Sequence, residues 1–215
     1  MIQLIQGRDR HLFPSEIDQM HKLRKQVFHE RLGWEVPVIN EWEVDGYDTL
    51  DPLYVLSIAG DGRVVGGLRL LPTTGFNMLN DSFPELLPEG ERFASPLIWE
   101  SSRFTVDRGA DARPRIRGGI GRATAELGLA MNELGMHVGL THIVTVYDAF
   151  LHRILERSDC AGEPLSEPKI VGGVLTYAVL YEIGPELESR LRTASGITES
   201  VLPQQGLPRP LIAAE

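Results

Sequence analysis

The spacing of apolar positions predicts an alternation of helices and strands along the chain. In residues 14–31 apolar side chains recur at every third or fourth position and Gly33 follows, so the pattern predicts one amphipathic helix. Further helices are expected at residues 79–87, 121–135, 147–158 (with Phe150 facing inward) and 185–194. Strands are expected at residues 1–6, 53–58, 63–71, 96–106, 141–146 and 169–183.

Glycines mark turns and irregularities in the predicted strands. Asp61-Gly62 separates two apolar runs and predicts a hairpin turn. Gly66-Gly67 predicts a bulge in the returning strand, and Gly172-Gly173 predicts a break within residues 169–183.

This order of elements predicts one α/β (α+β) domain over residues 1–195, in which helices cover a mixed sheet. The 215 residues suffice for a real core, and 42% hydrophobic with 24% charged residues is ordinary for a globular chain. Residues 196–215 contain three prolines, and we expect them to form a loose tail.

Composition also narrows the environment and the partners. No apolar run approaches the roughly 20 residues of a membrane helix, and no secretory signal is visible at the N-terminus. The single cysteine, Cys160, has no internal disulfide partner, so we expect a cytoplasmic protein. The net charge of −9 argues against nucleic acid as the main partner.

The charges form two clusters of opposite sign. Residues 41–51 contain five acidic side chains and no basic one, whereas residues 108–122 contain five arginines against Asp111 alone. Such clusters suggest two ligands of different charge, although a solvated surface is the ordinary explanation of a charge run.

Residues 96–106 form an apolar, strand-like run that contains a carboxylate, Glu100, and a guanidinium, Arg103. Charges in such a segment are costly unless they are paired or used. Regular alternation predicts that Glu100, Ser102 and Phe104 share one face of the strand, with Arg103 on the other. A structural ion pair and a functional site remain open on this pattern alone.

Two further patterns indicate binding. The glycine-rich turn before the helix at 121–135, flanked by arginines, suits a phosphate, although a simple tight turn fits as well. Arg24 and Phe28 share a helix face, and an aromatic and acidic loop follows with Trp34, Asp45 and Asp48. This loop suits a partly apolar cation, and core packing is the alternative for its aromatic rings.

Together these positions resemble the acyl-homoserine-lactone synthase family, the bacterial autoinducer synthases. The resemblance extends over roughly residues 1–180 and rests on Arg24, Phe28, Trp34, Asp45, Asp48, Gly66-Gly67-Leu68-Arg69-Leu70-Leu71-Pro72-Thr73-Thr74, Phe83, Trp99-Glu100-Ser101-Ser102-Arg103-Phe104 and Thr145. It implies a GNAT-like acyltransferase fold, with a central mixed twisted sheet flanked by helices on both faces.

The resemblance implies an enzyme that joins the amino group of S-adenosylmethionine to an acyl group from an acyl-carrier protein or acyl-coenzyme A. Lactone closure then releases methylthioadenosine. S-adenosylmethionine is a substrate, so no cofactor is expected, and no metal site is expected either. An ammonium is no nucleophile, so a carboxylate must accept its proton, and Glu100 is the candidate base. The acidic run at residues 41–51 would suit the charges of this substrate.

The resemblance assigns the other residues to three groups. The S-adenosylmethionine pocket or its organisers are Arg24, Phe28, Trp34, Asp45, Asp48, Arg69, Phe83 and Arg103. The acyl and pantetheine pocket is expected to contain Ser102, Phe104, Met131, Thr145 and Phe150. The phosphate loop is Arg117, Gly118, Gly119 and Gly121, and an acidic carrier would dock on Arg117, Arg122, Arg153 and Arg157.

Two other functions fit the same pattern. One is an ordinary GNAT-type N-acyltransferase that forms no lactone. The other is a non-catalytic relative that binds the ligand. Release of methylthioadenosine separates the first from a lactone synthase.

Overall fold

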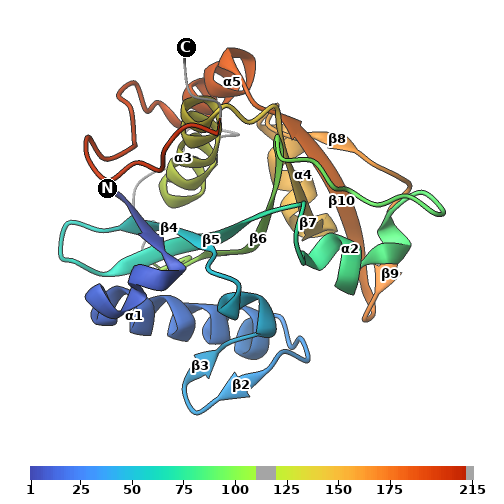
Figure 1. Ribbon diagram of the computed structural model, residues 1–215, viewed down its shortest axis with the longest axis horizontal. Coiled ribbons are helices and arrows are strands. Elements are labelled where there is room, and N and C mark those ends of the chain that lie inside the picture. The colour runs from blue at the N-terminus through green and yellow to red at the C-terminus, as the bar shows by residue number, and fades with distance from the viewer. Residues whose placement is uncertain (110–119, 212–215) are drawn as a thin grey trace.

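A mixed β-sheet forms the centre of the computed structural model, which describes residues 1–109 and 120–211 (Figure 1). The strands of this sheet are β1 Ile2–Gln6, β4 Leu53–Ile58, β5 Val64–Pro72, β6 Ile98–Val106, β7 His142–Asp148, β8 Glu163–Pro164, β9 Lys169–Val171 and β10 Val174–Glu182. They lie in the order β1-β4-β5-β6-β7-β10-β8, with β9 also paired to β10. A separate hairpin contains β2 Val38–Ile39 and β3 Trp42–Glu43.

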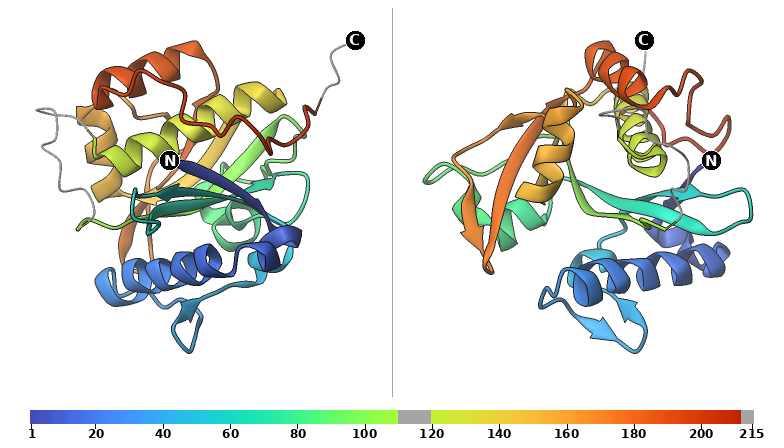
Figure 2. Two further views of the ribbon diagram at one scale, coloured as in Figure 1. Left: turned by 90° about the vertical axis from the view of Figure 1, so that its left-hand side faces the viewer. Right: turned by 180° about the vertical axis from the view of Figure 1, so that it is seen from behind.

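Helices cover both faces of the sheet. The helices are α1 Pro14–Arg24, which continues as a π-helix at Lys25–Arg31, α2 Met78–Ser82, α3 Arg122–Val138, α4 Ala149–Arg157 and α5 Pro185–Ser195. Short 3-10 turns occur at Gly7–Leu12, Gly46–Thr49 and Pro84–Leu86. Figure 2 shows α1 and α3 on opposite faces of β4 and β5, with α5 beside α3. The predicted arrangement, a central mixed sheet with helices on both faces, is therefore confirmed.

Most predicted elements are present. The C-terminal end of α3 differs from the prediction, and packing explains the difference. Helix α3 runs to Val138 and is capped by Gly139 in the left-handed conformation (φ 86°), not by Gly135 as expected. Gly135 lies inside the helix, and a Cβ there would stand 2.9 Å from Ile183 Cγ2. That glycine allows close packing and does not end the helix.

The pairing of β5 with β6 contains one extra residue on β6, and this corrects the predicted strand faces. Gly67 pairs with Thr105, but Arg69 pairs with Ser102, so Arg103 and Phe104 lie opposite Leu68 alone. This is the arrangement of a β-bulge, which interrupts regular alternation. The pairing of β4 with β5 contains a second irregularity. Ser57 pairs with Gly66 and Ile58 pairs with Val64, so this shift lies next to Gly66 and not at Gly66-Gly67 as predicted.

The bulge changes the direction of two functional side chains. Arg103 has a left-handed backbone (φ 55°) and bonds to Glu43 on the α1 side, the side on which Arg69 bonds Ser102. Phe104 packs into the core cluster that includes residues of α3. The prediction that Arg103 and Ser102 point to opposite faces, with Phe104 beside Ser102, is therefore wrong.

Strands β6 and β7 are parallel and separate after a short ladder. Their pairing extends only from Ile98 with His142 to Ser101 with Thr145. Both strands continue beyond these pairs, to Val106 and Asp148, as the sheet opens between them (Figure 2). The carboxyl ends of adjacent parallel strands are where open α/β sheets bind ligands.

Of the tail that the composition predicts to be loose, the described residues 196–211 are attached to α3. The carboxylate of Glu133 accepts hydrogen bonds from Ser200 Oγ at 2.6 Å and from the Val201 amide at 3.1 Å. The amide of Leu211 donates to Val138 O at 2.8 Å. Val201 and Leu202 also pack against the core. Within the described ranges, no helix has the length and apolar character that crossing a bilayer requires.

Candidate active site

Three arginines and three carboxylates are buried together between α1 and the sheet. We call this group the arginine–carboxylate network; it consists of Arg24, Arg69, Arg103, Glu43, Asp45 and Asp48. None of these side chains is more than 10% exposed. The three positive and three negative charges balance, as burial requires.

The arginines from α1 and β5 share their partners. Arg24 donates to Glu43 at 2.5 Å and, through both terminal nitrogens, to Asp48 at 2.9 and 3.0 Å. Arg69 donates to Asp45 at 2.5 Å and to Asp48 at 2.9 Å. Two-point contacts of this kind fix direction as well as distance, so each arginine holds the loop in one position.

Local structure brings the carboxylates to these arginines. Asp45 caps the 3-10 turn that follows it, accepting from the Tyr47 amide at 2.9 Å, while its own amide donates to Asp48 at 2.9 Å. The Tyr54 hydroxyl also donates to Asp48, at 3.0 Å. Burial alone would raise the pKa of Asp48, but Arg24 and Arg69 hold that pKa well below its ordinary value.

The acidic run at residues 41–51 is therefore not free to bind a cation. Its three central carboxylates belong to the network, Glu41 pairs with Lys25 at 2.9 Å, and Asp51 pairs with Arg8 at 3.2 Å. The expectation that this run receives a cationic ligand is wrong, because arginines and lysine from elsewhere in the chain neutralise it.

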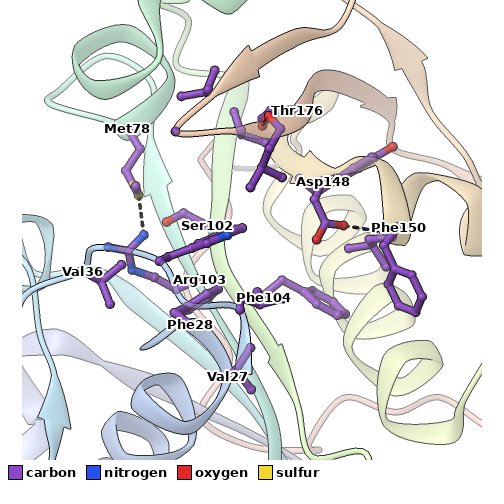
Figure 3. Close-up of a pocket in the computed structure, with 18 of the residues that line it drawn as sticks. Val27, Phe28, Val36, Met78, Ser102, Arg103, Phe104, Asp148, Phe150 and Thr176 are labelled. Atoms are coloured by element: carbon purple, nitrogen blue, oxygen red, sulfur yellow. Dashed lines mark hydrogen bonds between the residues drawn. The ribbon is translucent and has the colours of Figure 1, made fainter. Parts of the chain in front are cut away.

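A cavity of about 750 Å³ lies between the N-terminal layer and the β7, α4 and β10 side of the molecule (Figure 3). Arg103, Ser102 and Met78 lie on one side of it, whereas Asp148 and Phe150 lie on the other (Figure 3). Of the expected pocket residues, those that line it are Phe28, Trp34, Phe83, Glu100, Ser102, Arg103, Phe104 and Phe150. Arg24, Asp45, Asp48 and Arg69 are not among the lining residues; they buttress the wall through the network.

Glu100 lies in the wall of this cavity and also fixes α2. Its carboxylate accepts from the backbone amides of Met78 at 2.9 Å and Leu79 at 2.6 Å, the first residues of that helix. The residue is 1% exposed. Burial raises the pKa of Glu100, and the two amide hydrogen bonds offset part of that effect. A carboxylate with a raised pKa in a cavity has the properties of a general base or acid.

Arg103 presents one nitrogen that the carboxylates do not use. Its Nε donates to Glu43 at 3.0 Å, and its Nη2 lies 2.7 Å from Asp45. Within the described part of the chain, Nη1 donates to the sulfur of Met78 at 3.6 Å, and Figure 3 shows that sulfur pointing at the guanidinium. A thioether is a weak acceptor, so this nitrogen can donate to a stronger ligand such as a carboxylate.

An aromatic pair lies next to this guanidinium. Phe28 and Trp34 stack with centroids 5.3 Å apart, and the Arg103 guanidinium lies 5.4 Å from the Phe28 centroid. Both rings line the cavity, as the sequence predicts for a wall that contacts a partly apolar cation.

A second, smaller pocket of about 60 Å³ lies on the α3 side of β6. Phe104, Met131 and Thr145, three of the residues that the resemblance assigns to the acyl pocket, line it together. Ser102 lies in the larger cavity instead, and Ser101 takes its place, because the side chains of adjacent strand residues point to opposite faces.

Phe150 corrects another expectation, because its side chain is 54% exposed and does not pack inward. It lines the larger cavity, and the Arg108 guanidinium lies 4.8 Å from its ring centroid. The expected phosphate-loop residues Arg117, Gly118 and Gly119 lie outside the described residues. Gly121 is the N-cap of α3.

Sequence reasoning missed three residues of the site. Glu43 binds two network arginines, Met78 contacts Arg103 and Glu100, and Ser101 faces the smaller pocket. Glu43 was visible as one of the acids between Trp42 and Asp45, but nothing in a charge run distinguishes a buried carboxylate from an exposed one. Among the described residues, no group of three His, Cys, Asp or Glu side chains would hold a metal ion.

Comparisons with known proteins agree with this geometry. The model of the autoinducer synthase family matches residues 10–191. A probable acyl-homoserine-lactone synthase of Sinorhizobium fredii is 38% identical over 175 residues, which cover 81% of this chain and 84% of that protein. The acyl-homoserine-lactone synthase of Pseudomonas aeruginosa is 35% identical over 203 residues, covering 94% and 96%.

A solved structure is similar over nearly the whole chain. It is that of a coenzyme A-dependent acyl-homoserine lactone synthase, BjaI, with S-adenosylmethionine and isopentyl-coenzyme A. The two structures superpose with a TM-score of 0.81 at 30% identity, covering 97% of this chain and 94% of the other.

The network makes a prediction about stability. Replacing Arg69 by methionine keeps much of the volume but leaves Asp45 and Asp48 with one cationic partner fewer. We expect the free energy of unfolding to fall by about 3–5 kcal/mol, because an uncompensated charge stays buried. Urea denaturation measures this change. Lys22→Met, which breaks the exposed Lys22–Asp18 pair, is the control and should change stability far less; equal effects of both variants would contradict the prediction.

Proposed function

The chain belongs to the autoinducer synthase family, and from this we infer that it is an acyl-homoserine-lactone synthase. It is an acyltransferase that joins the amino group of S-adenosylmethionine to the acyl group of a thioester and then closes the lactone, releasing methylthioadenosine. The observation that carries this assignment is a buried carboxylate, Glu100, in the same cavity wall as the Arg103 guanidinium, whose Nη1 donates, among the described residues, to the Met78 sulfur. These two groups match the ammonium and the carboxylate of an amino acid.

In the proposed binding mode the methionyl end of S-adenosylmethionine lies at β6. Its carboxylate replaces Met78 as the partner of Arg103 Nη1, because a charged acceptor binds a guanidinium more strongly than a thioether does. Its ammonium lies at Glu100. The sulfonium and the adenosyl group extend along Phe28 and Trp34, whose ring faces attract a cation. Since the acidic run is neutralised, aromatic rings take the role first expected of carboxylates.

The acyl transfer then needs one proton acceptor. Glu100 takes a proton from the ammonium, directly or through a water, and the free amine attacks the thioester carbonyl. An amide bond forms, the carbon–sulfur bond of the thioester breaks, and the thiol leaves. Backbone amides of β6 are candidates for the oxyanion, because the β6–β7 ladder ends at Ser101.

Lactone closure follows without a further reactant. A carboxylate oxygen of the acylated methionyl group attacks the side-chain carbon that bears the sulfonium. The carbon–sulfur bond breaks, its electron pair neutralises the sulfonium, and neutral methylthioadenosine leaves. Arg103 holds the carboxylate throughout in this scheme, so it fixes the direction of attack.

The thioester donor is acyl-coenzyme A or an acyl-carrier protein, both of which are anionic. The solved relative BjaI is named as coenzyme A-dependent. For a carrier protein, the exposed arginines Arg153 and Arg157 on α4 are the proposed docking residues, together with Arg122 at the start of α3. The cytoplasmic location expected from the sequence stays a prediction.

Glu100→Gln tests the base. We expect methylthioadenosine release to fall by a factor of about 10²–10⁴, because the amide cannot accept the proton. Binding of methylthioadenosine, measured by calorimetry, should change little. Glu85→Gln, in an exposed position, is the matched control. Unchanged turnover in a folded Glu100→Gln protein would rule out this role.

The same residue predicts a pH dependence. Only ionised Glu100 accepts a proton, and its pKa is raised above the ordinary value of 4.5. As the pH falls through that raised pKa, Glu100 becomes protonated and kcat/KM decreases. We therefore expect an acid limb with a midpoint above 4.5 that disappears in Glu100→Gln. An acid limb identical in both proteins would belong to another group.

Charge reversal on α4 tests the docking face. The double variant Arg153→Glu, Arg157→Glu should raise the KM for an acyl-carrier protein about tenfold or more at low salt, because it repels an acidic partner. Turnover with acyl-coenzyme A should stay within about twofold in the same preparation, which confirms an intact site. Arg8→Glu with Arg63→Glu is the matched control on another part of the surface. An unchanged KM for the carrier in the α4 variant would place docking elsewhere.

A further inference from the structure

The smaller pocket continues from the larger cavity and extends toward α5. Five residues line both spaces: Ser101, Phe104, Thr124, Tyr147 and Leu151. Because they form a neck between the space next to Glu100 and the space under α3, an acyl chain whose carbonyl lies at Glu100 enters the smaller pocket through them.

Helix α5 closes the far end of this pocket. Leu187 and Leu191 of α5 line it and are 2% and 5% exposed. Leu191 packs over Gly128 of α3, where a Cβ would lie 3.1 Å from Leu191 Cδ2. The glycine therefore gives Leu191 the room to lean over α3, and the leucine occupies space that a longer ligand would need.

Two tyrosines close the side of the pocket next to β10. The hydroxyls of Tyr147 and Tyr181 lie 3.3 Å apart, and the Tyr147 hydroxyl is also 3.3 Å from His152 Nδ1. His152 stacks on Tyr177 with centroids 4.0 Å apart. Displacing a hydroxyl that is already hydrogen-bonded and next to stacked rings costs free energy, so we expect this wall to keep its position when a ligand binds.

The volume sets the size of the ligand. An apolar cavity of about 150 Å³ in another protein accommodates benzene, so about 60 Å³ accommodates about two or three carbon atoms. The neck adds room for the carbons next to the carbonyl. We propose that this enzyme selects short aliphatic acyl groups, from butanoyl to hexanoyl or their branched isomers, and that Leu191 over Gly128 sets the limit. The proposal rests on the synthase function inferred above and names its acyl substrate.

A series of acyl donors tests the limit. Methylthioadenosine release is measured with butanoyl-, 3-methylbutanoyl-, hexanoyl-, octanoyl- and dodecanoyl-coenzyme A, and with the same acyl groups on carrier protein. We expect kcat/KM for the dodecanoyl donor to be at least about tenfold below that of the best short donor, since overfilling a packed pocket is unfavourable. A dodecanoyl donor as good as the short donors would overturn the proposal.

Two substitutions should move the limit in opposite directions. Leu191→Ala removes the side chain over Gly128, so the preference for hexanoyl or shorter groups should shift toward octanoyl and dodecanoyl. Gly128→Ala pushes Leu191 into the pocket, so butanoyl should gain relative to hexanoyl. Leu127→Ala is the matched control, because Leu127 is buried on the same helix but does not line the pocket. Its donor preference should equal that of the wild type.

The readout is a ratio of kcat/KM values within each protein, so partial loss of folded enzyme does not affect it. If Leu191→Ala does not fold, Leu191→Val gives the same direction with a smaller shift. An unchanged ratio in the folded Leu191 variant, or an equal shift in Leu127→Ala, overturns the role of Leu191. A wild-type enzyme that releases no methylthioadenosine with any donor refutes the synthase function itself, a result distinct from turnover without length preference.

Discussion

The arginine–carboxylate network is the constraint on which the rest of the site depends. Its charges come from four segments that local interactions would not hold together: α1, residues 43–48 (the end of β3 and the 3-10 turn that follows), β5 and β6. A buried network of this kind adds little net stability compared with an apolar core. Removing one member, however, leaves its partners buried without a counter-charge. It therefore fixes the geometry of the wall. Glu43 and Asp45 hold the Arg103 guanidinium, which lies 5.4 Å from the centroid of the Phe28 ring. Trp34 stacks on the same ring, and both rings line the cavity.

The position of Arg103 is the most specific consequence of that constraint. A left-handed backbone at a residue with a side chain costs of order 1–3 kcal/mol and persists only where the surroundings impose it. Here Glu43 and Asp45 bind two of its nitrogens, and the bulge turns the third toward Met78 and the cavity. Since Glu100 holds the amide of the same Met78, the proposed base and the proposed carboxylate anchor are linked through one residue. A shift of either group would move the other.

Much of the fold followed from the sequence, because helical periodicity, glycine pairs and apolar runs are local signals. The burial of Glu100 in the cavity wall could also be anticipated, since a carboxylate within an apolar strand must be paired or used. The faces of β6 could not be predicted, because no glycine marks Arg103 and its backbone is fixed by partners up to 60 residues away. The neutralisation of the acidic run could not be predicted for the same reason. Composition gives the number of charges but not which arginines pair with these carboxylates in the fold. The attachment of the C-terminal segment depends on Glu133, a side chain that helix periodicity alone treats as ordinary.

In the proposed binding mode, strand β6 separates the S-adenosylmethionine site from the acyl site by the thickness of a single strand. In this scheme Glu100 and Ser102 line the larger cavity alone, whereas Ser101 and Phe104 also line the smaller, apolar pocket, so the amine and the acyl chain approach from different sides. They can meet only where the sheet is open, and the β6–β7 ladder ends at Ser101. In the proposed reaction the new amide bond therefore forms at this end of the ladder. A fully paired β6 and β7 would keep both binding sites and still prevent the reaction, because the strand would stand between the reacting atoms.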